Sequence, residues 1–282
     1  MTNVLRMSAF ADGEDGGNPA GVVLDAADLS DDQMLRIAQE VGYSETAFVG
    51  AVVDEPSGRR YNVRYWSPAA EVPFCGHASV ATAVALAERD GVGGLTLATQ
   101  AGDVAIDTKR DDHGAIQVAM TSVRPEIRDL DPVALDSLLD LLGLVPADLD
   151  PRFPPRESFA GNWHPVLVLA DREIFNQFRF APKPVAELMI RQGWTGTITV
   201  LREVGRNDFE GRNIFPVGRI TEDPATGSAA ASVGAYLRSI GYTSPESAIT
   251  IHQGSHVGRP SLLTVTVPDA GGITVAGSAT LL

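Results

Sequence analysis

The pattern of hydrophobic and polar positions along the chain predicts many short strands and few helices. Alternating positions in the first half predict strands at 4–10, 20–24, 46–52, 61–66, 95–99, 104–108 and 115–120. In the second half they predict strands near 164–169, 197–201, 208–215, 250–252, 262–267 and 273–281. The two halves are therefore expected to resemble each other in the order of their elements.

Helical periodicity is confined to a few segments with recognisable ends. Ser30 and Gln33 match a capping box for a helix that ends near Gly42. Small residues predict a helix over 77–89, closed by Gly91, and another after Gly227. Two further helices are expected, one from the cap Asp131 through 142 and one from Pro184 through 191.

A polar segment at 122–131, which contains Pro125, marks the expected boundary between two domains. The first domain is predicted to span 1–121 and the second 122–270. The last strand, within 271–282, is predicted to return to the first domain.

Composition narrows the class of protein. The 282 residues are 44% hydrophobic and 21% charged, which is typical of a globular protein. A net charge of −14 disfavours nucleic acid and anionic membranes as partners. The single cysteine excludes an intramolecular disulfide. The sequence also shows no signal-peptide pattern and no apolar run of ~18 residues. Together these features favour a cytoplasmic location.

Two polar, glycine-containing turns run directly into small-residue helices. They are Cys-Gly-His-Ala-Ser at 75–79 and Glu-Asp-Pro-Ala-Thr-Gly-Ser at 222–228. The N-terminus of a helix presents unpaired N–H groups and a partial positive charge, and so attracts anions. We expect two such cradles to face one cleft between the domains and to hold a small anionic carboxylate.

In the first domain, Glu45 stands between a helix end and an apolar strand, where a shielded carboxyl would suit general acid/base catalysis. A solvated glutamate at a strand start is the alternative. His77 could donate to substrate or relay a proton, or merely cap its helix. Gly76 permits close approach of a ligand, with Ser79 a further binding residue. Cys75 could be a thiolate base or a small buried apolar residue.

In the second domain, Asp223 could orient a substrate or take part in proton transfer, or simply act as the helix N-cap. The amides of Thr226, Gly227 and Ser228 could bind a carboxylate. An exposed Asn18, in the Gly-Asn-Pro turn of the first domain, could hold a substrate amide or carboxylate, although a structural turn is the simpler interpretation. The segment 253–260 is similarly interpreted as a hairpin connection.

Several patterns are absent from the sequence. There is no Gly-x-Gly-x-x-Gly, no Walker motif and no Gly-x-Ser-x-Gly elbow. The five histidines show no metal-ligand spacing, and Gly254 argues against a helix that would pair His252 with His256. We therefore expect neither a metal nor an organic cofactor, with side chains alone moving protons.

Taken together, the motifs resemble those of the phenazine-biosynthesis PhzF-like proteins over nearly the whole chain. The matching stretches, in the family's order, are 17–21, 43–48, 75–79, 222–230 and 253–260. The resemblance implies an α+β fold of the diaminopimelate-epimerase type, in which two similar domains each form a strand-rich roll around a central helix. It further implies an active site between the domains, a homodimer and no cofactor.

The resemblance also implies roles for particular residues. Glu45 would be the proton-transferring acid/base, while Gly76, His77 and Asp223 would line the site. Gly227 and Ser228 would bind the substrate carboxylate. Related epimerases use two cysteines, and this chain keeps Cys75 but is expected to have Pro224 at the second position, which excludes a symmetric two-thiol mechanism.

Three functions are consistent with these residues. The first is a cofactor-independent isomerase that moves a proton between carbons through Glu45. The second is a racemase or epimerase in which Cys75 is one base and Glu45 or Asp223 the other. The third is a binding protein for small carboxylates that lacks the chemistry.

Overall fold

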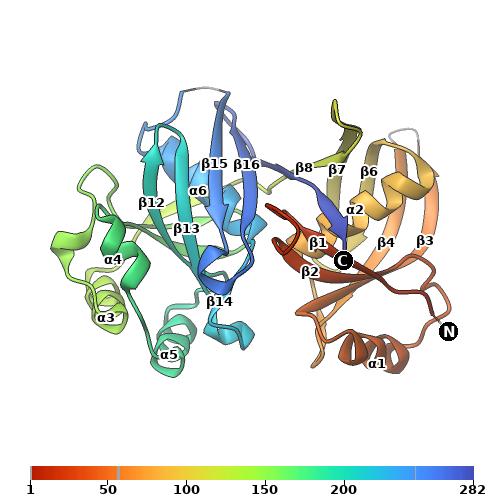
Figure 1. Cartoon of the computed structure of the whole chain (residues 1–282), viewed down its shortest axis with the longest axis horizontal. Coiled ribbons are helices and arrows are strands. Elements are labelled where there is room, and N and C mark those ends of the chain that lie inside the picture. Colours follow the sequence, from red (N-terminus) through yellow and green to blue (C-terminus); the bar gives the residue numbers. More distant parts are fainter. Residues whose placement is uncertain (1, 56–57, 245) are drawn as a thin grey trace. The chain divides into compact units, whose positions relative to one another are not determined.

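The computed structural model describes residues 2–55, 58–244 and 246–282, and the chain divides into two units (Figure 1). Unit 1 comprises Met1–Thr121 and Ala276–Leu282, and unit 2 comprises Ser122–Val275. The chain thus leaves unit 1 at the polar segment that suggested a boundary. The returning segment begins at Ala276, later than the predicted 271.

Unit 1 is built from strands that pair in the order β18–β1–β2–β3–β4–β6–β7–β8. The β2–β3 and β4–β6 pairs are parallel and the others antiparallel, with the short β5 also on β4. The strands are β1 Leu5–Ala9, β2 Asn18–Val23, β3 Glu45–Glu55, β4 Gly58–Trp66, β5 Glu71–Val72, β6 Gly93–Thr99, β7 Gly102–Arg110, β8 Ile116–Thr121 and β18 Ala279–Leu281.

Helix α2, Gly76–Asp90, is the centre of unit 1 (Figure 1). Every residue from His77 to Ala87 is buried, and the helix contacts β1, β2, β3, β7, β8 and β18. A helix buried on all sides needs small or apolar side chains throughout, which the run of Ala, Val, Ser and Thr provides. The expected roll of strands around a central helix is confirmed.

Helix α1, Asp31–Val41, lies outside this roll and begins and ends as predicted. Ser30 Oγ accepts from the Gln33 amide and Gln33 Oε1 accepts from the Ser30 amide, which forms the capping box. Gly42 closes the helix in the left-handed region at φ 73°. The buried Met34 and Ala38 belong to one hydrophobic cluster with Val23, Ala26, Phe48 and Trp66.

Unit 2 repeats this arrangement. Its strands pair in the order β9–β10–β11–β12–β13–β15–β16, the β11–β12 and β13–β15 pairs being parallel, with the short β14 on β13. They are β9 Glu126–Asp129, β10 Arg156–Phe159, β11 Trp163–Val168, β12 Ile198–Gly205, β13 Asp208–Ile214, β14 Glu222–Asp223, β15 Ser247–Gln253 and β16 Ser261–Val267. Strand β17, Thr274–Gly277, spans the limit between the units.

The central helix of unit 2 is α6, Gly227–Ser239, which is buried from Ala229 to Leu237 and contacts β9, β10, β11 and β16. Helices α3 Pro132–Leu142, α4 Arg172–Gln177 and α5 Pro182–Gln192 form a separate layer. They enclose a second hydrophobic cluster that includes Leu138, Phe175, Met189, Trp194 and Ile214. Short 3₁₀ turns lie at Pro146–Asp148, Pro216–Gly218 and Ser255–Val257.

Some predicted elements differ from the structure. The turn expected at 16–19 ends at Gly17, and Asn18 already belongs to β2. Glycine is required at position 17 because φ is 79° there and a Cβ would lie 2.6 Å from the Ala9 carbonyl oxygen. Helix α5 begins at Pro182 instead of Pro184. The predicted strand 273–281 is divided into β17 and β18, and β5, β9, β10, β14 and α4 were not predicted.

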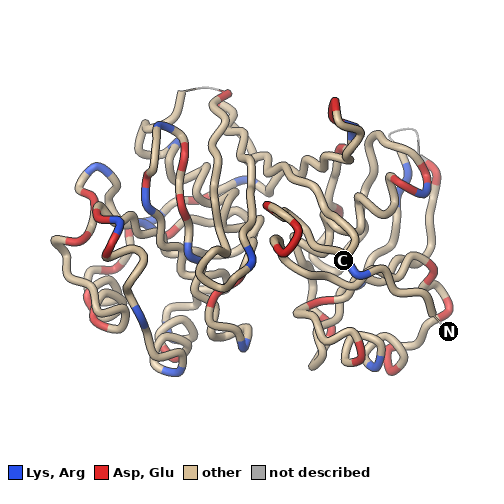
Figure 2. The backbone as a smooth tube through the Cα atoms, viewed as in Figure 1, with Lys and Arg blue, Asp and Glu red and all other residues tan. Residues whose placement is uncertain are grey.

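Charged residues of both signs are interspersed along both units (Figure 2). Among the described residues no helix is both long and apolar enough to cross a bilayer.

One ion pair of unit 2 is buried. Arg212 and Glu222 have side chains only 4% and 9% exposed, and Arg212 Nη2 lies 2.5 Å from Glu222 Oε1. The Arg212 Nη1 donates to the Phe175 and Phe178 carbonyls, and its guanidinium lies over the Phe178 ring. This pair ties β13 and β14 to the end of α4.

Replacement of Glu222 by Gln should destabilise unit 2 because it leaves a buried guanidinium without its counter-charge. We expect a loss of about 2–4 kcal/mol in the free energy of unfolding, measured by urea denaturation. The control Asp129→Asn removes an exposed partner of Arg156, 3.3 Å away, and should cost less than about 1 kcal/mol. Equal losses in the two variants would contradict the structural role of the buried pair.

Candidate active site

Glu45 is the first residue of β3, and the parallel pairing of β2 with β3 places it beside Ala20. Its side chain is 22% exposed. The alternative of a freely solvated glutamate is therefore disfavoured, because most of the side chain is covered by protein.

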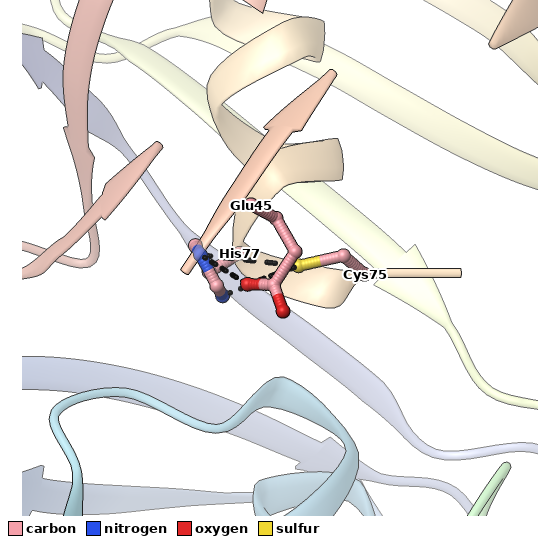
Figure 3. Close-up of side chains that lie close together, drawn as sticks. All are labelled: Glu45, Cys75 and His77. Carbon is pink, nitrogen blue, oxygen red and sulfur yellow. Dashed lines mark hydrogen bonds and ion pairs between the residues drawn. The ribbon is translucent and has the colours of Figure 1, made fainter. Parts of the chain in front are cut away.

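The start of α2 brings two more groups to this carboxylate. Cys75 is the N-cap, in extended conformation with φ −143° and ψ 118°, and the helix begins at Gly76. Figure 3 shows Cys75 and His77 pointing from the helix start toward Glu45 on its strand. Both residues are buried, with 8% and 7% of their surface exposed.

The three side chains form a close triangle. Glu45 Oε2 lies 3.5 Å from His77 Nε2 and 3.5 Å from Cys75 Sγ. Sγ lies 3.4 Å from Nδ1 and 3.8 Å from Nε2 of His77. Cys75 is thus more than a small apolar residue, since its thiol is in contact with both candidate proton carriers.

Two polar side chains orient the His77 ring. An Asn18 amide N–H donates to Nδ1 over 3.2 Å, and Ser44 Oγ lies 3.4 Å from Nε2. With Nδ1 accepting, the proton of a neutral imidazole resides on Nε2 and faces Ser44 and Glu45. Asn18 is only 2% exposed, so its side chain is buried and not exposed as expected. The structure shows its contact with His77, and a role in holding substrate stays a prediction.

Gly76 and Ser79 differ in their surroundings. A Cβ added to Gly76 would meet only Met120 Cε, at 3.9 Å, among the described atoms, so packing does not explain the glycine. Ser79 is fully buried, and its hydroxyl donates to the Cys75 carbonyl and contacts the Tyr65 hydroxyl at 2.6 Å. Burial raises the pKa of Tyr65, which keeps that hydroxyl neutral. These contacts give Ser79 a structural role and do not support substrate binding.

The second predicted cradle lies within unit 2, at the start of α6. Thr226 is the N-cap, so the expectation that Asp223 caps this helix is wrong. The Thr226 hydroxyl instead donates to Asp223 Oδ2 over 2.5 Å. Gln253 accepts from the Thr226 amide and donates to the Asp223 carbonyl, which fixes the turn. The Thr226 amide is thus already engaged, which leaves Gly227 and Ser228 as the candidate anion-binding amides.

The two helix starts are alike in backbone geometry. Thr226, with φ −120° and ψ 95°, precedes Gly227 as Cys75 precedes Gly76. Thr226 is therefore the counterpart of Cys75, and the assignment of Pro224 to that position is wrong. The conclusion drawn from it holds, because threonine, like proline, supplies no second thiol.

Sequence reasoning missed His164, which lies under the start of α6. Its Nδ1 donates to the Thr197 carbonyl over 3.0 Å, and its Nε2 accepts from the Ser228 hydroxyl over 3.1 Å. A Cβ at Gly196 would lie 2.3 Å from the ring, so glycine is required there. Only the packing of β11 against the loop before β12 reveals this network, since His164 stands in an ordinary strand pattern.

The structure therefore brings the predicted residues together in two groups, one in each unit. Unit 1 gathers Asn18, Glu45, Gly76 and His77 around Cys75, and unit 2 gathers Asp223, Thr226, Gly227 and Ser228. The donor atoms of Glu45, Cys75 and His77 lie within 4.8 Å of one another, so these three could also hold a metal ion. Histidine spacing along the sequence gave no sign of this. His252 and His256 are not paired, and contact Asp208 and Asn176 instead.

Comparison with known proteins identifies the family to which the chain is related. A family model described as phenazine biosynthesis-like protein matches residues 7–282. The chain is 30% identical to the Bacillus subtilis protein named uncharacterized isomerase YfhB, over 95% of this chain and 92% of that one. It is also 30% identical to a trans-2,3-dihydro-3-hydroxyanthranilate isomerase of Pseudomonas fluorescens, over 93% and 89% of the two chains.

Solved structures agree with the fold. A Bacillus anthracis protein of the PhzF family superposes with a TM-score of 0.85 at 27% identity, covering 99% of this chain and 96% of the other. A probable proline racemase of Agrobacterium radiobacter shares the fold at 13% identity, with a TM-score of 0.64 over 99% and 90% of the chains. The predicted epimerase-like architecture is confirmed.

Burial lowers the pKa of His164 to about 4, so the folded protein holds this ring neutral. The unfolded chain protonates it near its ordinary value of ~6.5. The stabilisation is therefore complete above pH ~6.5 and is lost as pH falls from there to about 4. We expect this histidine to account for a loss of about 3 kcal/mol in the free energy of unfolding over that range.

The measurement is urea denaturation at several pH values for the wild type and His164→Gln. The variant should lose less stability between pH 6.5 and 4.5 than the wild type, whatever its stability at pH 7. The exposed His113→Gln serves as control and should follow the wild-type slope. Parallel pH profiles for all three proteins would contradict the buried neutral histidine.

Proposed function

The chain belongs to the phenazine biosynthesis-like family and is an isomerase of the PhzF type, and we propose that it moves a proton between two carbons of a small carboxylate without a cofactor. Glu45 is the proposed general acid/base. The observation that carries this proposal is the position of its largely covered side chain, whose Oε2 lies 3.5 Å from both His77 Nε2 and Cys75 Sγ.

In the proposed reaction the Glu45 carboxylate takes a proton from one substrate carbon and becomes a carboxylic acid. The electron pair of the broken C–H bond is delocalised toward the substrate carboxylate. The same proton then returns to a second carbon, which shifts the double bond and regenerates Glu45. Nε2 of His77, whose ring is held by Asn18, lies 3.5 Å from Oε2 and is proposed to keep that oxygen aligned between the two transfers.

Stabilisation of developing charge must supply the greater part of the rate. One positioned acid/base contributes about 10²–10⁴-fold, whereas enzymes accelerate reactions by at least ~10⁶-fold. The N-terminal amides of α2 and of α6, beginning at Gly76 and Gly227, are the proposed donors to anionic groups. Asp223, held by Thr226, is proposed to orient the substrate.

The substrate class follows from the chemistry of these groups. Amide-rich helix starts favour a small anionic carboxylate, and the relative from Pseudomonas fluorescens is named for a substrate of this kind. We propose that class for this chain without naming its member. A homodimer remains the expected assembly.

The alternative of a racemase with Cys75 and Glu45 as its two bases is disfavoured by geometry. Inversion requires bases on opposite faces of one carbon, each within about 3 Å of it, and hence about 5–6 Å apart. The 3.5 Å between Sγ and Oε2 leaves no room for a carbon between them. These two groups therefore act on the same side of a substrate.

Replacement of Glu45 by Gln should abolish proton transfer because it keeps the shape of the side chain and removes the titrating group. Wild type and variant are incubated in heavy water with trans-2,3-dihydro-3-hydroxyanthranilate and a panel of small carboxylates. Deuterium incorporation, followed by NMR and mass spectrometry, should fall at least 10²-fold in the variant. The exposed Glu40→Gln is the control and should exchange like the wild type. Equal exchange in all three proteins would refute the mechanism.

Replacement of Cys75 by Ser separates the isomerase from a thiol-dependent epimerase. If Glu45 is the base, the variant should keep exchange within about tenfold of the wild type, since serine preserves the hydrogen bonds. If the thiol is a base, exchange should fall by at least 10²-fold, as in the glutamate variant. The same heavy-water assay gives both readings, and the stereochemistry of the product shows whether inversion occurs.

A further inference from the structure

The triangle formed by Glu45, Cys75 and His77 has the dimensions of a metal-binding site. A tetrahedral zinc ion has Zn–S of ~2.3 Å and Zn–N or Zn–O of ~2.0–2.1 Å, which places its ligand atoms about 3.3–3.6 Å apart. The observed separations are 3.5 Å for Sγ–Oε2, 3.5 Å for Nε2–Oε2 and 3.8 Å for Sγ–Nε2. A point equidistant from the three atoms lies about 2.1 Å from each, which matches Zn–N and Zn–O and requires the ion to shift by about 0.2 Å away from Sγ.

The chemistry of the three donors selects the ion. Thiolate and imidazole favour Zn²⁺ and its analogue Co²⁺ over Mg²⁺ and Ca²⁺, which prefer sites made of oxygen alone. A carboxylate completes a mixed set of three protein ligands and leaves a fourth position open. The strongly negative chain, at −14, also favours the approach of a cation.

His77 has a polar side chain beside Nδ1, the ring nitrogen that would not bind the ion. A metal-bound imidazole donates its other N–H to a neighbouring acceptor, which fixes the ring. His77 Nδ1 lies 3.2 Å from the buried Asn18 amide, whose oxygen can accept that N–H once the amide is flipped. The site is therefore supported in the ring orientation that presents Nε2 to an ion.

We propose that Glu45, Cys75 and His77 bind one Zn²⁺ ion, and that the bound ion holds the isomerase inactive. Binding releases the thiol proton of Cys75 to solvent, and the thiolate, the neutral imidazole and the carboxylate each donate an electron pair to the ion. The ion then coordinates Oε2 of Glu45, so that the carboxylate can no longer take a proton from the substrate. Binding itself does not depend on the proposed function, whereas the loss of activity does.

Cobalt titration of the chelator-treated wild-type protein tests the site directly. A bound Co²⁺ with one thiolate and tetrahedral geometry should give a near-ultraviolet thiolate-to-cobalt charge-transfer band and intense visible bands that saturate at one ion per chain. Zn²⁺ should displace the cobalt and abolish both. An absence of the charge-transfer band at millimolar Co²⁺ would overturn the proposal.

Variants assign the ligands. Cys75→Ser should lose the charge-transfer band, and Glu45→Gln and His77→Gln should each weaken cobalt binding by at least tenfold. Glu40→Gln and His113→Gln, exposed residues of the same kinds in unit 1, should bind as the wild type does. Wild-type affinity in all three ligand variants would place the ion elsewhere and refute the site.

A measurement on the wild type alone guards against misfolded variants. One equivalent of Zn²⁺ should slow alkylation of Cys75, the only thiol, by at least tenfold, and a chelator should restore the rate. An unchanged alkylation rate would contradict the proposal. Deuterium exchange by the zinc-loaded protein should be lost and return with the chelator. Because cobalt binding and alkylation need no substrate, a failure of the Glu45 mechanism would leave their outcome unaffected.

Discussion

The enclosure of α2 by the strands of unit 1 is the constraint on which the site depends. Because the helix is buried from His77 to Ala87, its first turn cannot move without disrupting the core. That first turn carries Cys75 and His77, and the parallel pairing of β2 with β3 sets the position of Glu45. Asn18, the first residue of β2, then fixes the imidazole. The geometry of the proposed catalytic group is thus held by packing instead of by flexible loops.

The same backbone plan supports different chemistry in the two units. Both central helices start at a glycine after an extended N-cap that makes no side-chain cap. In unit 1 the second helical residue is His77, which meets a carboxylate. In unit 2 it is Ser228, which donates to the buried neutral His164. Unit 1 therefore offers groups suited to proton transfer, while the start of α6 in unit 2 offers helix amides, a neutral Ser228–His164 hydrogen bond and the Asp223 carboxylate.

The short distances within the triangle of Glu45, Cys75 and His77 suit proton transfer, and they also suit the binding of a metal ion. A proton carrier must lie within hydrogen-bond reach of its partners, and the ligands of a small ion are separated by similar distances. The thiol of Cys75 is the group that favours metal binding over a simple proton relay. Without Cys75, a carboxylate and an imidazole would form an ordinary relay with little affinity for zinc. With it, the site combines a soft thiolate with a borderline imidazole and a hard carboxylate.

The sequence by itself determined the two-part organisation, the two glycine-led helices and the identity of the candidate residues, because these depend on local periodicity, capping and short motifs. The capping box, the closing glycines and the period of the strands act over a few residues, so their signals are readable without a structure. Only the tertiary structure decided that Asn18 orients His77 and that the Ser79 hydroxyl is engaged inside unit 1. It also decided that Thr226, and not Asp223, is the N-cap of α6, and that His164 and Gln253 support the start of that helix. Each of these contacts joins segments whose neighbours are set by strand pairing and burial. No local pattern in the chain records which distant side chain fills a given space.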